Sequence, residues 1–231
     1  MTVIPPAPAP ETPVRAGFAL PRDIIIAPRR AFLAIARTNE WLPALAVIIA
    51  FGIGTTALAM PAILHIATVT GAAAKHAPPT PVQIREVAWM FTVGVVLVPL
   101  LIIAFTATTL TLVARFKDPQ APYVRFFALA ANCLVPSALG DFLHAVAVAV
   151  HSPASYNDLR SFQLALPDSL GVFAAPGNGS ELDFLSRFGL FDAWSFVLIA
   201  FGFSALAGVR FTTALVMAFV LDFTYAVFFF D

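Results

Sequence analysis

Long runs of apolar residues, separated by short polar segments, dominate the pattern of this chain. Five runs, at about 41–66, 88–114, 122–150, 190–208 and 210–230, could each cross a hydrocarbon core of about 30 Å, which takes roughly 20 helical residues. None alternates apolar and polar positions as a barrel strand does. The pattern therefore predicts an all-α integral membrane bundle of five transmembrane helices.

Two segments precede the first run. Residues 1–21 contain six prolines and no apolar run, which predicts a disordered, proline-rich tail. Residues 22–37 mix apolar residues with Arg29, Arg30 and Arg37, which is typical of an amphipathic helix in the membrane interface whose arginines contact anionic headgroups. A charged flank that only fixes the topology explains the same pattern, and the sequence leaves both readings open.

The basic residues are unevenly distributed between the two sides of the predicted bundle. Four of the thirteen, in the connections 67–87 and 151–189, lie on one side. The other nine lie on the side of the N-terminus: Arg15, Arg22, Arg29, Arg30, Arg37, Arg115, Lys117, Arg125 and Arg210. Because cytoplasmic segments carry the excess of lysine and arginine, we expect a cytoplasmic N-terminus and an external C-terminus.

The composition excludes several classes of protein. With 60% hydrophobic and 11% charged residues, and a mean hydropathy of +0.88, the chain cannot present the surface of a soluble domain. A net charge of zero provides no basic field for nucleic acid. Cys133 is the single cysteine, and no phosphate loop or common hydrolase motif occurs. We therefore expect a non-enzymatic protein without a cofactor.

The C-terminal third carries a recognisable pattern of apolar helices separated by short polar segments. Phe191, Asp192 and Trp194 lead into an apolar helix that contains Gly202 and Ser204, followed by a short loop and a last span. Together with the proline-containing segment 122–143, this pattern resembles the bacterial branch of the Yip1-domain family. The resemblance covers residues 22–230 as one membrane domain. It implies five spans and, for a bacterial member, a location in the inner membrane.

Acidic residues inside the spans are the candidate functional groups. Each costs roughly 2.5–3.5 kcal/mol at mid-membrane on insertion scales. Asp141 and Asp222 lie inside the third and fifth runs, Asp192 opens the fourth, and His144 lies one turn beyond Asp141. The three acids share helical stripes with small residues, which favours positions facing the bundle. Their depths predict one polar cluster in the outer half.

Two roles for this cluster remain open at the level of sequence. The groups could bond kinked backbone or face a shallow aqueous vestibule, or they could form a site for an ion, a proton or a polar ligand. A similar stripe of small residues, Ala200, Ser204 and Gly208, predicts close contact between the fourth and fifth spans.

The function expected from these features is that of a Yip1-like protein that organises the membrane or partner proteins. Its partners would be the lipid bilayer, other membrane proteins or a second copy of itself, and not nucleic acid. The alternative is a small transporter, or a component of an ion- or proton-coupled permease, that uses the acidic cluster.

Overall fold

The computed structural model describes residues 13–73, 80–175, 177–186 and 188–228. All regular structure in these ranges is helical, apart from one isolated β-bridge between Ser169 and Gly189. The helices are α1 (Pro13–Ile26), α2 (Pro28–Thr38), α3 (Leu42–Ala73), α4 (Pro81–Arg115), α5 (Tyr123–Cys133), α6 (Val135–Val150), η1 (Pro153–Ser155), α7 (Leu159–Gln163), η2 (Leu170–Phe173), α8 (Gly179–Ser186), α9 (Leu190–Ala207) and α10 (Phe211–Phe228).

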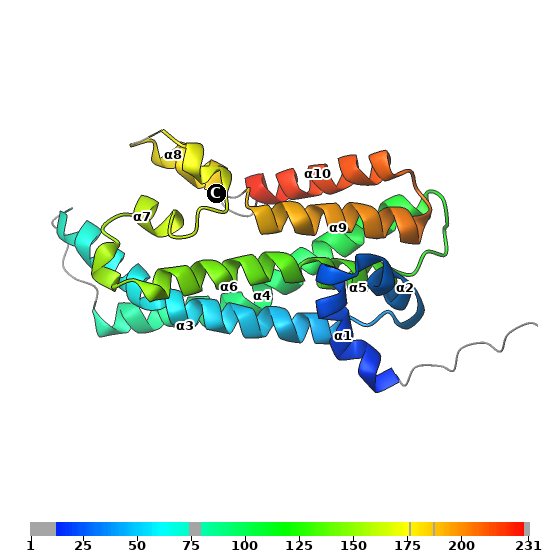
Figure 1. Cartoon of the computed structure of the whole chain (residues 1–231), viewed down its shortest axis with the longest axis horizontal. Coiled ribbons are helices and arrows are strands. Elements are labelled where there is room, and N and C mark those ends of the chain that lie inside the picture. Colours follow the sequence, from blue (N-terminus) through cyan, green and yellow to red (C-terminus); the bar gives the residue numbers. More distant parts are fainter. Residues whose placement is uncertain (1–12, 74–79, 176, 187, 229–231) are drawn as a thin grey trace, which may run out of the picture.

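Four helical segments in the described residues are long and apolar enough to cross a membrane: Leu42–Thr70, Val82–Arg115, Tyr123–Val150 and Leu190–Ala207. The long helices run lengthwise beside one another, with α3 against α6 and α9 against α10 (Figure 1). The all-helical membrane bundle is therefore confirmed. The fifth run forms α10, whose apolar part within the described residues is Phe211–Leu221, so a fifth span remains a prediction.

The third span is built from two helices, α5 and α6, that meet at Leu134. Proline lacks a backbone N–H, and its ring clashes with the carbonyl four residues earlier. Pro136 therefore prevents an uninterrupted helix, and a single turn residue links α5 to α6. The third span breaks at this proline, whereas α3 and α4 continue through Pro61 and Pro99.

The N-terminal tail is shorter than the prolines predict. Residues 13–21 belong to α1, which corrects the prediction of a disordered tail over residues 1–21; residues 1–12 lie outside the described part. Pro13 occupies the first position of the helix, where the missing N–H is not needed. Leu20 and Ile24 are buried, and α1 packs against α2 and α3. This burial stabilises a helix that proline content alone disfavours.

The short helix α2 has one buried apolar face and one exposed basic face. Ala31, Phe32 and Ile35 are buried and face α5 and α9, so the apolar side of this helix packs against protein. The three arginines Arg29, Arg30 and Arg37 are exposed. Their contact with lipid headgroups stays a prediction.

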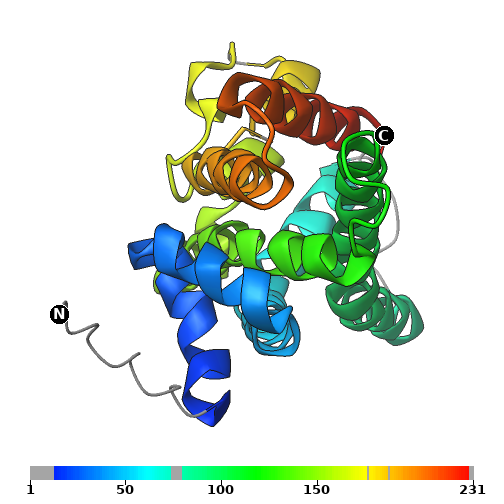
Figure 2. The same ribbon diagram turned by 90° about the vertical axis from the view of Figure 1, so that its right-hand side faces the viewer.

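The tightest packing lies where α1 and α2 cross the ends of the long helices, the end that faces the viewer in Figure 2. Phe126 of α5 and Phe203 of α9 are fully buried, with ring centroids 5.8 Å apart. Gly202 allows this approach, because a Cβ at its position would lie 2.3 Å from the Leu129 methyl carbon Cδ1. This core joins the N-terminal helices α1 and α2 to α5 and α9.

Two members of the small-residue stripe on α9 lie at the end of that helix. Ala200 is buried, but the Ser204 hydroxyl donates to the Val209 carbonyl at 2.8 Å. Gly208 ends the helix with a left-handed conformation, φ 61°, and its carbonyl accepts a hydrogen bond from the Lys117 ammonium. Ser204 and Gly208 therefore help to end α9. The contact between α9 and α10 is present, and the part that the stripe plays in it stays a prediction. Gly202 makes a separate close contact, with α2 and α5.

The connection 151–189 folds into the short elements η1, α7, η2 and α8, which cover the other ends of α6 and α9 (Figure 1). Tyr156 is buried and its hydroxyl donates to the Val148 carbonyl at 3.2 Å, which fixes the start of the connection to α6. Burial raises the pKa of this phenol. The folded connection covers one side of the polar cavity described next.

Candidate functional site

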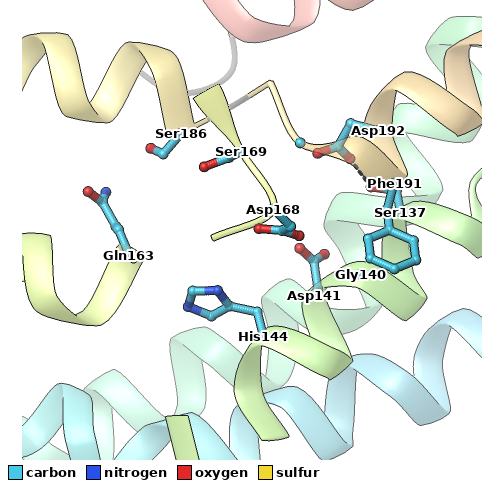
Figure 3. Close-up of a pocket in the computed structure, with 11 residues that line it drawn as sticks. Ser137, Gly140, Asp141, His144, Gln163, Asp168, Ser169, Ser186, Phe191 and Asp192 are labelled. Atoms are coloured by element: carbon cyan, nitrogen blue, oxygen red, sulfur yellow. Dashed lines mark hydrogen bonds between the residues drawn. The ribbon is translucent and has the colours of Figure 1, made fainter. Parts of the chain in front are cut away.

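A polar cavity of about 210 Å³ lies between α6, α9 and the folded connection (Figure 3). Four segments contribute to its wall, namely one face of α6, the end of α7 with the loop after it, the end of α8, and the start of α9. The lining residues are Ser137, Gly140, Asp141, His144, Gln163, Asp168, Ser169, Ser186, Gly189, Phe191 and Asp192.

The α6 wall follows directly from helical spacing. Ser137, Asp141 and His144 are four and three residues apart, so they lie one above another on the same face. Gly140 on the neighbouring position lets α9 approach, since a Cβ there would lie 2.7 Å from the Cβ of Phe191. The two helices are therefore held close enough to share one set of polar side chains.

The α9 wall is the start of that helix. Asp192 lies in the first turn, where the unpaired N–H groups and the helix dipole favour a negative charge. Its carboxylate accepts hydrogen bonds from the Ser137 hydroxyl and from the Gly189 backbone N–H. The Ser137 backbone N–H donates to the Ser195 hydroxyl at 3.1 Å, which ties α6 to α9 a second time. Asp192 is thus a fixed, hydrogen-bonded carboxylate.

Asp168 reaches the cavity through a short antiparallel pairing. The Leu190 N–H donates to the Asp168 carbonyl at 2.8 Å, and the Leu170 N–H donates to the Phe188 carbonyl at 3.1 Å. This pairing holds the Asp168 side chain opposite α6, with its carboxylate facing that of Asp141 (Figure 3).

His144 closes the outer side of the cavity. Its ring hydrogen-bonds to the Phe162 carbonyl, and the two rings pack with their centroids 5.5 Å apart. A carbonyl oxygen can only accept a hydrogen bond, so His144 donates one ring N–H to the Phe162 carbonyl of α7. Its other ring nitrogen is then left to bond a group in the cavity.

The charged side chains among the described lining residues are acidic. Its described lining contains three carboxylates and neither lysine nor arginine. Among the described residues, no hydrogen bond or ion pair reaches the carboxylates of Asp141 and Asp168. Repulsion between neighbouring carboxylates in a medium of low dielectric favours the uptake of a proton or another positive charge. No group of three metal-ligating side chains in the described chain is arranged to hold a metal ion.

The structure brings together three of the four residues proposed from sequence. Asp141, His144 and Asp192 line the same cavity. The side chain of Asp222 lies outside the described part of the chain. Asp168 is an addition, and sequence offered no signal for it, because it lies in an irregular loop without helical periodicity.

A second, larger cavity of about 750 Å³ continues from the first between α3, α4, α6, α9 and α10. Ser137, Asp141, Ser186 and Asp192 line both, so the two cavities lie next to each other. The remainder of the lining is mainly apolar and includes Ile48, Phe91, Val95, Val98, Ile102 and Leu221. We call this larger space the apolar groove.

Comparison with known proteins gives one match. The family model described as the Yip1 domain matches residues 22–230, from within α1 to two residues beyond the end of α10. No curated protein and no solved structure matches the chain.

Proposed function

This chain belongs to the Yip1-domain family of multi-pass membrane proteins, and we propose that it organises the membrane around it, or partner membrane proteins, without enzymatic chemistry. The proposal includes a fifth span at α10, a cytoplasmic N-terminus and an external C-terminus in a bacterial inner membrane. The nine-to-four distribution of basic residues supports this orientation.

The apolar groove is the observation that carries the proposal. It lies among helices that are apolar enough to be in the bilayer, and α4 borders it with large exposed side chains such as Met90, Phe91 and Val98. Lipid chains or the helix of a partner protein are the molecules available at that depth. A groove that holds one of them would give a membrane-organising role a defined binding site.

Site-specific photo-crosslinking in native membranes tests this role. A photoreactive residue at Val98, which is 44% exposed and lines the groove, is compared with one at Leu112, which is 58% exposed on the same helix but outside the groove. We expect a defined lipid or protein adduct at Val98 that is absent at Leu112. Identical products at both positions would show only general exposure to lipid and would contradict the proposal.

The polar cavity favours a second candidate, the permease component. Asp141 and Asp168 lie in it without hydrogen bonds from the described residues and could exchange a proton or cation. Proteoliposomes would then show a proton or cation flux that Asp141→Asn abolishes, whereas Glu86→Gln, which removes an exposed acid from α4, leaves it unchanged. Absence of flux in the wild-type protein excludes this candidate.

A further inference from the structure

The polar cavity and the apolar groove lie side by side, so together they match an amphiphile, a molecule with one polar and one apolar end. Ser137, Asp141 and Asp192 line both cavities, so a molecule that occupies both would pass beside these three side chains. The volume of the apolar groove, about 750 Å³, lies within the roughly 300–1,000 Å³ typical of ligand sites. An apolar chain in the groove would place its head group in the polar cavity.

The charge of the cavity determines which head group fits. The described lining offers the carboxylates of Asp141, Asp168 and Asp192 and no basic residue. Since Asp192 is already hydrogen-bonded within the protein, Asp141 and Asp168 are the groups left to be paired. An ammonium group donates three charge-assisted hydrogen bonds and would satisfy both. A phosphate or carboxylate in the head group would be repelled by the same three acids.

An independent observation places a polar contact in the groove itself. The hydroxyl oxygen of Thr55, on the α3 wall, is buried and has no hydrogen-bond partner among the described residues. Buried polar groups are nearly always hydrogen-bonded in native proteins. Because the oxygen itself is covered, the Thr55 side chain must rotate before a hydroxyl, amide or ester group of an amphiphile can supply that partner; a plain hydrocarbon chain could not supply it in any rotamer.

We propose that the apolar groove and the polar cavity bind an amine-bearing lipid with a net positive head group, its ammonium between Asp141 and Asp168 and its chain along α4. The inference rests on the proposed function in one respect, that the groove faces the bilayer. It adds the chemical class of the lipid. A zwitterionic phospholipid, an anionic lipid and a partner helix are the occupants that the experiment must separate from it.

Photoreactive lipid analogues test the head group on the wild-type full-length protein, in nanodiscs of neutral phosphatidylcholine. A photoreactive hexadecylamine is compared with the matched photoreactive hexadecanoic acid and a photoreactive phosphatidylethanolamine. We expect the amine to label α4 at the groove at least about tenfold more than either, a difference set by the ionic hydrogen bonds. Equal labelling by the three probes would overturn the inference.

Variants then locate the head group. Asp141→Asn and Asp168→Asn should each reduce amine labelling about tenfold, while Glu86→Gln, the matched loss of an acid outside both cavities, should not. Protection of the buried thiol of Cys133 against a thiol-reactive dye shows that each variant is folded. Unchanged labelling in both folded Asp variants would also overturn the inference.

The two proposals fail in different ways. Crosslinks at Val98 to lipids of any head group, or to a protein, would overturn the amine-lipid inference and leave the membrane-organising function in place. The absence of any groove-specific crosslink in native membranes would remove that function, whatever the probe series shows in nanodiscs.

Discussion

Gly140 offers the most direct test of how α6 and α9 are held together around the polar cavity. Replacing it with alanine adds one methyl group, which would lie 2.7 Å from the Cβ of Phe191 and 2.8 Å from two of its ring carbons. Carbon atoms in good contact are about 3.5–4.0 Å apart. Because the Cβ of Phe191 is fixed to the α9 backbone, a side-chain rotation cannot remove the clash, and the two helices must separate.

The expected magnitude combines two opposing effects. An additional methyl group in a well-packed contact costs about 1–3 kcal/mol, and the clash with a backbone-anchored atom favours the upper end. Alanine is a better helix former than glycine by about 1 kcal/mol, which offsets part of that loss. We therefore expect Gly140→Ala to lower the free energy of unfolding by about 2 kcal/mol, and the melting temperature by about 4–8 °C.

Gly94→Ala on α4 is the matched control. It also places alanine for glycine inside a long helix, but nothing lies within 4 Å of the added methyl group. It should raise the melting temperature slightly through helix propensity alone. The single, fully buried Cys133 reports unfolding in both variants when a thiol-reactive dye is present during heating. A Gly140→Ala melting temperature at or above that of the wild type would refute the close-packing argument.

Three further predictions concern other parts of the molecule. Reporter fusions that fluoresce only in the cytosol should be bright near Lys117 and dark after Asp231, and the opposite pattern would contradict the proposed orientation. Asn132→Ala removes a buried amide that donates to the carbonyls of Glu40 and Ala128, each at 2.9 Å; it should lower stability in the same melting assay by about 1–3 kcal/mol, and no change would show that neither bond matters. The Ser161 backbone N–H and hydroxyl hold the pKa of Asp158 below its usual value, so this helix cap stabilises the fold above about pH 3.9 and loses its effect as the pH falls through the lowered pKa. An NMR titration should show Ser161→Ala raising the pKa of Asp158, and an unchanged pKa would assign the shift to the backbone bond alone.

The membrane spans were predictable because the hydrophobic effect dominates their formation. Apolar length alone located α3, α4 and α9, since a bilayer leaves a long hydrophobic run few alternatives to a helix. Pro136 likewise marked the break in the third span by a local steric rule. The same rule failed at the N-terminus, where tertiary burial of Leu20 and Ile24 holds α1 together despite its prolines.

The site was predictable only where helices determine it. Asp141 and His144 lie on one helical face, so their proximity follows from spacing. The position of Asp168 depends on the pairing of Ser169 with Gly189, two loop residues that are far apart in sequence and show no periodicity. Likewise, the close approach of α9 to α2 and α5 at Gly202 was not predicted, because Phe32 and Leu129 belong to segments whose placement the α9 sequence does not encode.

The unequal lengths of α4 and α9 have a consequence for the bilayer. At 1.5 Å per residue, the apolar run 88–114 of α4 extends about 40 Å, whereas the 18 residues of Leu190–Ala207 extend about 27 Å. A hydrocarbon core of about 30 Å matches α9 but not α4, so α4 must tilt, protrude or thicken the lipid beside it. The protein therefore presents two hydrophobic thicknesses on different sides of its circumference. We expect such a molecule to concentrate where a membrane changes thickness, and to impose that change where the membrane is uniform.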